Sequence, residues 1–146
     1  MYLCVMKHIA IVNGPNLNLL GSREPSIYGE QSFDDYFQGL QARWVGVRLT
    51  VFQSNVEGEI INELQRLASE EGCSGIVLNA AAYSHTSIAI ADTLKAISVP
   101  VVLVHISNIF AREEERKTDL MASSAKGLIC GLGLSGYDLA IRALIS

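Results

Sequence analysis

The chain has 146 residues, of which 49% are hydrophobic and 18% are charged, and its formal net charge is −4. This length predicts a single domain over residues 1–146 with ample apolar material for a core. The charge gives no basic surface for nucleic acid or an anionic membrane, and no apolar run reaches the roughly eighteen residues of a membrane span.

The N-terminal residues 1–5 are too short to be a signal peptide. We expect them to be a disordered extension, or to precede an alternative start at Met6. The three cysteines, Cys4, Cys73 and Cys130, are widely spaced and show neither a CxxC motif nor metal-ligand spacing. They are therefore expected to be free thiols in a reducing compartment, by default the cytoplasm.

The first half of the chain predicts a strand at residues 7–13 and then a long polar segment. Ser32, with Asp35 three residues later, resembles a capping box and predicts a helix that runs to about residue 45. Alternating β-branched residues predict a second strand at 47–53. The next helix carries its apolar residues between 60 and 68 on one face, and Gly72 is its expected C-terminal stop.

The second half continues the alternation of strands and helices. A nearly all-apolar run predicts a third strand at 75–79, buried on both faces. Beyond it the patterns predict a helix at 88–96, a fourth strand at 101–106, a charged helix or turn at 111–117, a fifth strand at 127–130 and a last helix from 135 to the end.

This order of elements predicts an α/β protein with a parallel sheet covered on both faces. The most common arrangement of five such units is a flavodoxin-like three-layer sandwich with strand order 2-1-3-4-5. Ligands of open parallel sheets bind outside the carboxyl ends of the strands, near the switch in strand order. Here the switch lies between strands one and three, so the segments 13–29, 79–86 and 105–116 are expected to form the site.

The segment 13–29, which reads NGPNLNLLGSREPSIYG, is longer than an ordinary connection. Its leucines and isoleucine are apolar anchors of the kind that disordered segments lack. We therefore interpret it as a binding loop with a mobile tip at 22–28.

A GxGxxG pattern, GLGLSG, occupies residues 131–136. It follows a predicted strand and opens a helix, which is the context that a dinucleotide site requires. It lies on the last βα unit, however, and the chain ends before an acidic ribose ligand. We interpret it as a tight turn with close helix packing rather than a nucleotide site.

Two of the three histidines, His85 and His105, lie at the ends of neighbouring strands of the predicted sheet. A single histidine is more often a structural or surface residue, but two at neighbouring strand ends make a catalytic role about equally probable. Neither has a nearby cysteine or third ligand of the kind a zinc site requires, so no metal is expected.

Arginines lie in two of the segments that are expected to form the site. Arg112 and Arg116 stand among three glutamates and are better interpreted as solvated surface. For Arg23 and Tyr28 we consider the hypothesis that the arginine makes the phenol acidic enough to act as a base. Half-ionisation of a tyrosine at neutral pH requires roughly 4 kcal/mol of stabilisation of the phenolate. An arginine about 4 Å away supplies on the order of 4 kcal/mol at an effective dielectric near 20. Arg23, helped by a second arginine, could therefore make Tyr28 a general base.

Several separated motifs occur in an order that resembles one enzyme family. They are GPNLNLLGSREPSIYG in the long loop, QSNVEGEI at 53–60, LNAAAYSHTSIAIAD at 78–92, HISN and AREE between 105 and 114, and AKGLICGLGLSGY at 125–137. From about residue 7 to the C-terminus, the chain resembles the type II 3-dehydroquinate dehydratases, which are cofactor-free enzymes of the shikimate pathway.

This resemblance implies dehydration of 3-dehydroquinate to 3-dehydroshikimate by anti elimination through an enolate. By motif position, Tyr28 would abstract the proton beside the ketone, and Arg23 would stabilise the phenolate. Asn16 would hold a water on the enolate oxygen, and His105 would protonate the departing hydroxyl.

The resemblance also implies how the substrate is held and how the subunits assemble. Its hydroxyls and carboxylate would bind to Asn79, His85, Ile106, Ser107 and Arg116. Asp92 matches a position that reaches the site of a neighbouring subunit. Members of the family form trimers that assemble into dodecamers, so a homo-oligomer is expected.

The sequence departs from the family pattern at three places. Leu103 stands where the family usually has a glutamate, two residues before the strand-four histidine and therefore on the same face of the strand. Glu115 replaces an aromatic residue, and the segment 117–124 is atypical. Leu103 and the fold leave a second interpretation open, namely an impaired relative or a flavodoxin-like module that binds a small carboxylate or flavin.

Overall fold

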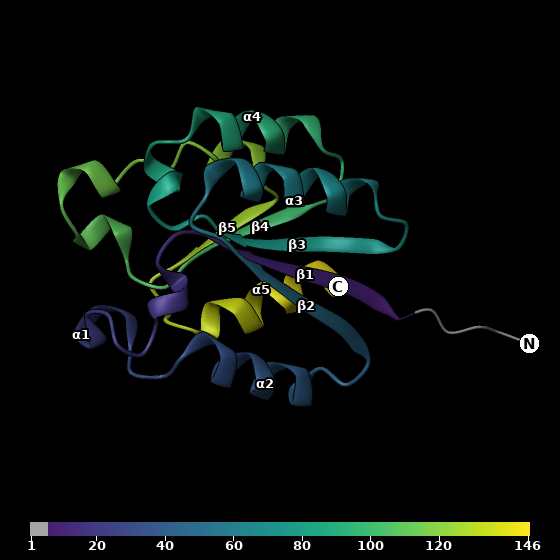
Figure 1. Ribbon diagram of the computed structural model, residues 1–146, viewed down its shortest axis with the longest axis horizontal. Helices are drawn as coiled ribbons and strands as arrows, with labels where there is room; N and C mark the ends of the chain where they lie inside the picture. The colour runs from purple at the N-terminus through teal and green to yellow at the C-terminus, as the bar shows by residue number, and fades with distance from the viewer. Residues whose placement is uncertain (1–5) are drawn as a thin grey trace, which may run out of the picture.

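The protein is described by a computed structural model that covers residues 6–146 (Figure 1); the expectation for residues 1–5 lies outside the described residues. Five parallel strands form one sheet in the order β2-β1-β3-β4-β5. The strands are β1 (Lys7–Asn13), β2 (Val47–Gln53), β3 (Cys73–Asn79), β4 (Val101–His105) and β5 (Gly127–Cys130). The predicted strand order is confirmed.

Helices cover both faces of the sheet, as Figure 1 shows. One layer consists of α2 (Phe33–Arg43) and α5 (Ser135–Ile145), and the other of α3 (Glu57–Ser69) and α4 (Ile88–Ala96). Successive residues of a strand point to opposite faces, so Ile9 and Ile11 of β1 pack in the α2–α5 layer. Ala10 and Val12 pack against α3 and α4. The three-layer sandwich is therefore confirmed.

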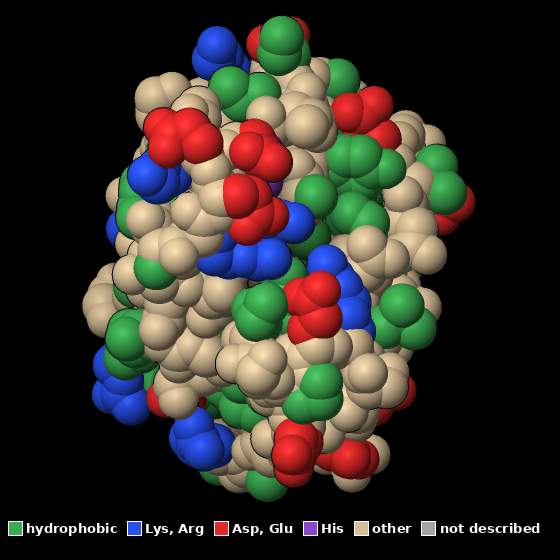
Figure 2. Space-filling model, turned by 90° about the vertical axis from the view of Figure 1, so that its left-hand side faces the viewer, with side chains coloured by type: hydrophobic (Ala, Val, Ile, Leu, Met, Phe, Trp, Pro, Cys, Tyr) green, Lys and Arg blue, Asp and Glu red, His purple; other side chains and the backbone are tan. Residues whose placement is uncertain are grey.

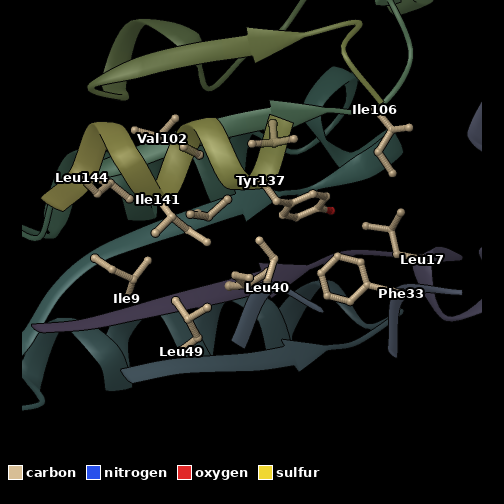
Figure 3. Packing of buried hydrophobic residues seen from close by; sticks show 14 of the residues in the cluster. Ile9, Leu17, Phe33, Leu40, Leu49, Val102, Ile106, Tyr137, Ile141 and Leu144 are labelled. Atoms are coloured by element: carbon tan, nitrogen blue, oxygen red, sulfur yellow. The ribbon is translucent and has the colours of Figure 1, made fainter. Parts of the chain in front are cut away.

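The core under α5 is closed by aromatic packing (Figure 3). The Tyr137 ring in the first turn of α5 meets the Phe33 ring edge-on, with 4.9 Å between the centroids. Figure 3 shows the Tyr137 hydroxyl pointing toward the end of the sheet where Leu17 and Ile106 lie. Burial of such a ring stabilises the fold by about 1.5–3 kcal/mol, and its position brings a polar group to the edge where the strands end.

Most predicted boundaries agree with the structure, and the exceptions have local causes. The Ser32 hydroxyl accepts a hydrogen bond from the Asp35 amide at 3.2 Å, as the capping pattern predicted. Helix α3 ends at Ser69, and Gly72 instead lies in the turn before β3, with φ +94°. The charged stretch, predicted as a helix or turn, forms two short 3-10 turns, Ile109–Ala111 and Glu114–Arg116.

The GLGLSG stretch joins β5 to α5. Gly131 has φ +86°, a left-handed conformation that favours glycine. A Cβ at Gly136 would lie 3.1 Å from Val104 Cγ1, so α5 packs closely on β4 at this point. The interpretation as a tight turn with close helix packing is confirmed. Over the described residues, none of the helices has the length and apolar character needed to cross a membrane.

Candidate active site

A cavity opens at the carboxyl ends of β1, β3 and β4, where the strand order predicted a site. Figure 2 faces this edge of the molecule and shows Lys and Arg side chains gathered near its middle, with Asp and Glu side chains beside them. Nine of the ten predicted site residues line the cavity: Asn16, Arg23, Tyr28, Asn79, His85, His105, Ile106, Ser107 and Arg116. The exception is Asp92, an exposed residue of α4.

The backbone of the segments that line the cavity is strained. Within the described residues, the non-glycine residues with positive φ are Asn16 (69°), Glu24 (39°) and Ala81 (53°). Such conformations cost on the order of 1–3 kcal/mol each and cluster at functional sites. Glu24 precedes α1 (Pro25–Tyr28), a single helical turn inside the long loop that carries Tyr28 to the cavity.

Tyr28 is held by two arginines: both guanidinium carbons lie over its ring, Arg23 at 4.5 Å and Arg112 at 5.5 Å from the centroid, but their closest contacts differ. Arg112 Nη1 donates a hydrogen bond to the Tyr28 hydroxyl at 2.8 Å. The guanidinium carbon of Arg23 lies 4.5 Å from the ring centroid, over the π face. The hydroxyl partner is therefore Arg112, and Arg23 makes a cation–π contact.

The interpretation of Arg112 as solvated surface is wrong, because its side chain is only 14% exposed. Acidic neighbours in the sequence suggested an exposed stretch, but the short turn at 109–111 directs this side chain inward. There Arg112 also donates to the Ser107 hydroxyl at 3.3 Å. Two cations therefore surround one phenol.

Arg116 is the third arginine at the cavity. Its Nε donates to Glu113, and this hydrogen bond, with smaller attractions from Tyr28 and Glu24, raises the pKa of Arg116. The guanidinium is thus fixed as a cation and oriented by a carboxylate. A cation in this position suits the binding of an anionic group on a substrate.

The two predicted histidines lie side by side. The His85 and His105 rings are stacked, with centroids 5.9 Å apart and 16° between their planes. His85 Nδ1 lies 2.7 Å from the backbone oxygen of Thr118 and therefore donates to it. His105 Nε2 lies 2.7 Å from Asp119 Oδ2, and the exposed fractions of these two side chains are 6% and 4%.

Asp119 was not found by sequence reasoning. It lies within the atypical segment 117–124, and one acidic residue in a polar stretch gives no pattern that indicates burial. Its only sequence signal was indirect: Leu103 left the histidine without the expected carboxylate. Leu103 itself is buried in the core layer formed with α3 and α4.

A chain of buried hydrogen bonds fixes the orientation of the Asn79 side chain. Asn79 Nδ2 donates to the Tyr137 hydroxyl at 2.8 Å. That hydroxyl in turn donates to Asn13 Oδ1, also at 2.8 Å. Burial raises the pKa of Tyr137 well above its ordinary range, so the phenol stays neutral and keeps its proton for this contact. Asn79 Oδ1 accepts from the Ala81 amide, so both ends of the amide are oriented.

The start of the long loop is tied to the last residue of β2 and to the segment that follows it. The Asn16 amide donates to Asn55 Oδ1 at 3.0 Å. Gln53 Nε2 donates to the Gly14 carbonyl at 3.1 Å. These bonds place Asn16 at the rim of the cavity. Within residues 6–146, no three or more His, Cys, Asp or Glu side chains come together as a metal-binding group would require.

The site therefore combines a phenol between two cations, an imidazole paired with a carboxylate, and a further arginine at one cavity. This is an acid–base arrangement for an anionic substrate. A family model described as Dehydroquinase class II matches residues 7–145.

The chain belongs to this family.

The class II dehydroquinase relatives cover nearly the whole chain. A 3-dehydroquinate dehydratase of Bacillus subtilis is 50% identical over 145 residues, which is 97% of this chain and 95% of the relative. The crystal structure of the type II dehydroquinase from Butyrivibrio crossotus superposes with a TM-score of 0.93 at 39% identity, covering 97% of this chain and 99% of that one. That from Propionibacterium acnes gives 0.90 at 42% identity, covering 96% and 97%. The resemblance found in the motifs is confirmed.

Proposed function

We propose that this class II dehydroquinase is a hydro-lyase that converts 3-dehydroquinate to 3-dehydroshikimate in the shikimate pathway. The observation that carries the proposal is the placement of the Tyr28 hydroxyl, with Arg112 at 2.8 Å, in the same cavity as His105. A base and an acid on one cavity can act on two neighbouring carbons of a bound substrate. Relatives named 3-dehydroquinate dehydratase that match over nearly the full chain support this activity.

In the first step the Tyr28 phenolate takes the proton from the carbon beside the ketone, and the released electron pair forms the enolate. Arg112 and Arg23 stabilise the phenolate before transfer, and they orient the ring. In the second step the enolate re-forms the ketone as the new carbon–carbon double bond expels the β-hydroxyl. His105 donates a proton to that hydroxyl, which leaves as water.

Binding and orientation fall to the remaining residues of the cavity. Arg116, held as a cation by Glu113, binds the substrate carboxylate. Asn16 holds the water on the enolate oxygen, and Asn79 binds a hydroxyl through its oriented amide. His85, Ile106 and Ser107 complete the enclosure of the substrate.

Ultraviolet absorbance tests this function directly, because dehydration creates a conjugated enone that absorbs where the substrate does not. Purified wild type should turn over 3-dehydroquinate, and Tyr28→Phe should reduce kcat by at least about 100-fold, the lower end of what a general base contributes. Far-ultraviolet circular dichroism should show an unchanged fold. A wild-type rate in Tyr28→Phe would remove Tyr28 as the base.

We further propose a homo-oligomer of trimers assembled into a dodecamer, in which Asp92 reaches a neighbouring site. The support is its position: Asp92 is exposed on α4, and it does not line the cavity of its own chain. Light scattering that returned a monomeric mass would contradict the assembly.

A single catalytic domain and a cytoplasmic location complete the proposal. The location is supported by free thiols at Cys73 and Cys130 among the described residues. Secretion of the native protein would contradict that location.

A further inference from the structure

Residues 118–120, which follow the two short 3-10 turns, contact both histidines of the cavity. The Thr118 carbonyl accepts from His85 Nδ1, and Asp119 Oδ2 lies 2.7 Å from His105 Nε2. The Leu120 amide donates to the Ser84 carbonyl at 2.8 Å, next to His85 in the chain. These three successive residues therefore bind to the cavity wall at three points.

The Asp119 carboxylate is itself held in place. Its second oxygen, Oδ1, accepts a hydrogen bond from the Met121 amide at 2.8 Å. Met121 is completely buried and packs in the same core layer as Leu103. A carboxylate that is fixed at one oxygen by the backbone and buried beside an imidazole has little freedom to turn away.

The position on β4 where the family usually has a glutamate is occupied by Leu103, a residue of the hydrophobic core. Leu103 is 1% exposed, and it shares its face of β4 with His105 because the two residues are two apart. Leucine offers the imidazole no hydrogen-bond acceptor. The carboxylate partner of His105 thus comes from a segment fourteen residues farther along the chain instead of from the strand.

We propose that Asp119 is the positioning residue for His105, and that it takes the role that the family usually gives to a glutamate on the strand. It fixes the orientation and tautomer of the imidazole and stabilises the imidazolium. The inference rests on the proposed function, in which His105 is the acid. It also removes the ground for regarding Leu103 as a mark of an impaired enzyme.

The contact determines which nitrogen delivers the proton. An ionised carboxylate only accepts hydrogen bonds, so Nε2–H of His105 donates to Asp119. The transferable proton of the imidazolium is then on Nδ1, and it passes to the departing hydroxyl. After this transfer Nε2 still carries its proton, which remains hydrogen-bonded to Asp119, and Nδ1 has a lone pair. Solvent returns a proton to Nδ1 and removes the proton that Tyr28 took.

Asp119→Asn tests the role with the smallest change in shape. The Asn oxygen can still accept from the Met121 amide, but the amide nitrogen then faces Nε2 and favours the opposite tautomer. We expect kcat to fall at least about tenfold, and by less than the roughly 100- to 10,000-fold that loss of an acid can cost. KM should stay within about twofold. Glu114→Gln is the matched control, because Glu114 is 85% exposed and pairs with Lys117.

Moving the carboxylate back to the strand gives the decisive comparison. Leu103→Glu in the Asp119→Asn background places a carboxylate two residues from His105, and we expect it to recover most of the lost kcat. Leu103→Glu alone should not raise kcat, since the imidazole is already paired. A folded double variant with no recovery, or Asp119→Asn with wild-type kcat, would overturn the proposal.

Nitrogen NMR of the His105 side chain provides a readout that does not depend on turnover. The wild type should show the proton of the neutral imidazole on Nε2, and Asp119→Asn should show it on Nδ1. The same tautomer in both proteins would overturn the proposal. Absence of dehydratase activity in the wild type would instead contradict the proposed function, while the NMR comparison would still report on the contact.

Discussion

At the scale of single residues, the chemistry that we propose for this site depends on one hydrogen bond. The Tyr28 hydroxyl has Arg112 as its partner, while Arg23 covers the ring and Arg116 is engaged by Glu113. The guanidinium of Arg112 is largely buried, so its charge is less screened than that of a surface arginine. Among the three arginines, Arg112 should therefore contribute most to stabilising the phenolate.

Arg112→Gln removes this charge and keeps a hydrogen-bond donor. We expect kcat to fall roughly 100- to 1,000-fold, since a cation near a phenolate supplies on the order of 4 kcal/mol at an effective dielectric near 20. Steady-state kinetics at one pH measure it. Arg43→Gln is the control, because the 58% exposed Arg43 pairs with Asp138 away from the cavity. A kcat within twofold of wild type would reassign the phenolate partner.

At the scale of secondary-structure elements, α5 connects the core to the site. Its first turn carries Tyr137, whose hydroxyl joins Asn79 at the end of β3 to Asn13 at the end of β1. The neighbouring Tyr36 of α2 has its ring 6.3 Å away, but its buried hydroxyl has no hydrogen-bond partner within residues 6–146. Tyr137 is buried and Tyr36 is partly buried in the same core layer, and their hydroxyls thus differ in hydrogen bonding.

Replacing each of these tyrosines by phenylalanine separates packing from hydrogen bonding. Tyr137→Phe leaves the Asn79 amide and the Asn13 oxygen without their partner, so the free energy of unfolding should fall by about 1–3 kcal/mol. Tyr36→Phe removes a hydroxyl that has no hydrogen-bond partner within residues 6–146, and should leave stability unchanged or slightly raised. Urea unfolding followed by circular dichroism measures both. Equal losses would show that the hydrogen-bond chain does not stabilise the fold.

At the scale of the whole molecule, stability should depend on pH through His8, at the opposite end of the sheet from the cavity. His8 is 3% exposed, and its Nε2 shares a hydrogen bond with Thr50 at 2.7 Å. Burial, and then the Arg48 cation, lower the pKa of His8. Glu70, 3.6 Å from Nδ1, opposes this shift without reversing it, because desolvation is the larger effect.

A lowered pKa in the folded state means that the unfolded chain binds the proton more readily. The contribution of His8 to stability is thus complete above the unfolded value near 6.5 and is lost as the pH falls through the folded-state pKa. We expect wild type to lose more free energy of unfolding than His8→Gln between pH 7 and 5, by at most about 1.4 kcal/mol per pH unit. Urea unfolding at fixed protein concentration measures it, and parallel pH profiles would contradict it.

Local pattern alone determined the elements, and the most common arrangement of five such units then predicted the strand order and the edge of the sheet that holds the site. The alternation of apolar residues in β1 and the capping pair of Ser32 and Asp35 act over a few residues, so they can be read without the fold. Parallel strands end at one edge, which is why Tyr28 and His105 could be expected at a common cavity long before any contact was known.

Only the tertiary structure decided which groups touch. Arg112 and Asp119 both lie in polar stretches where sequence indicates solvent, and neither has a periodic pattern that indicates burial. Burial of a charge depends on a partner far away in the chain: 84 residues separate Arg112 from Tyr28, and 14 separate Asp119 from His105. Such pairs form because the fold brings a compensating group next to a charge that is removed from water. A local sequence pattern contains no information about that distant partner.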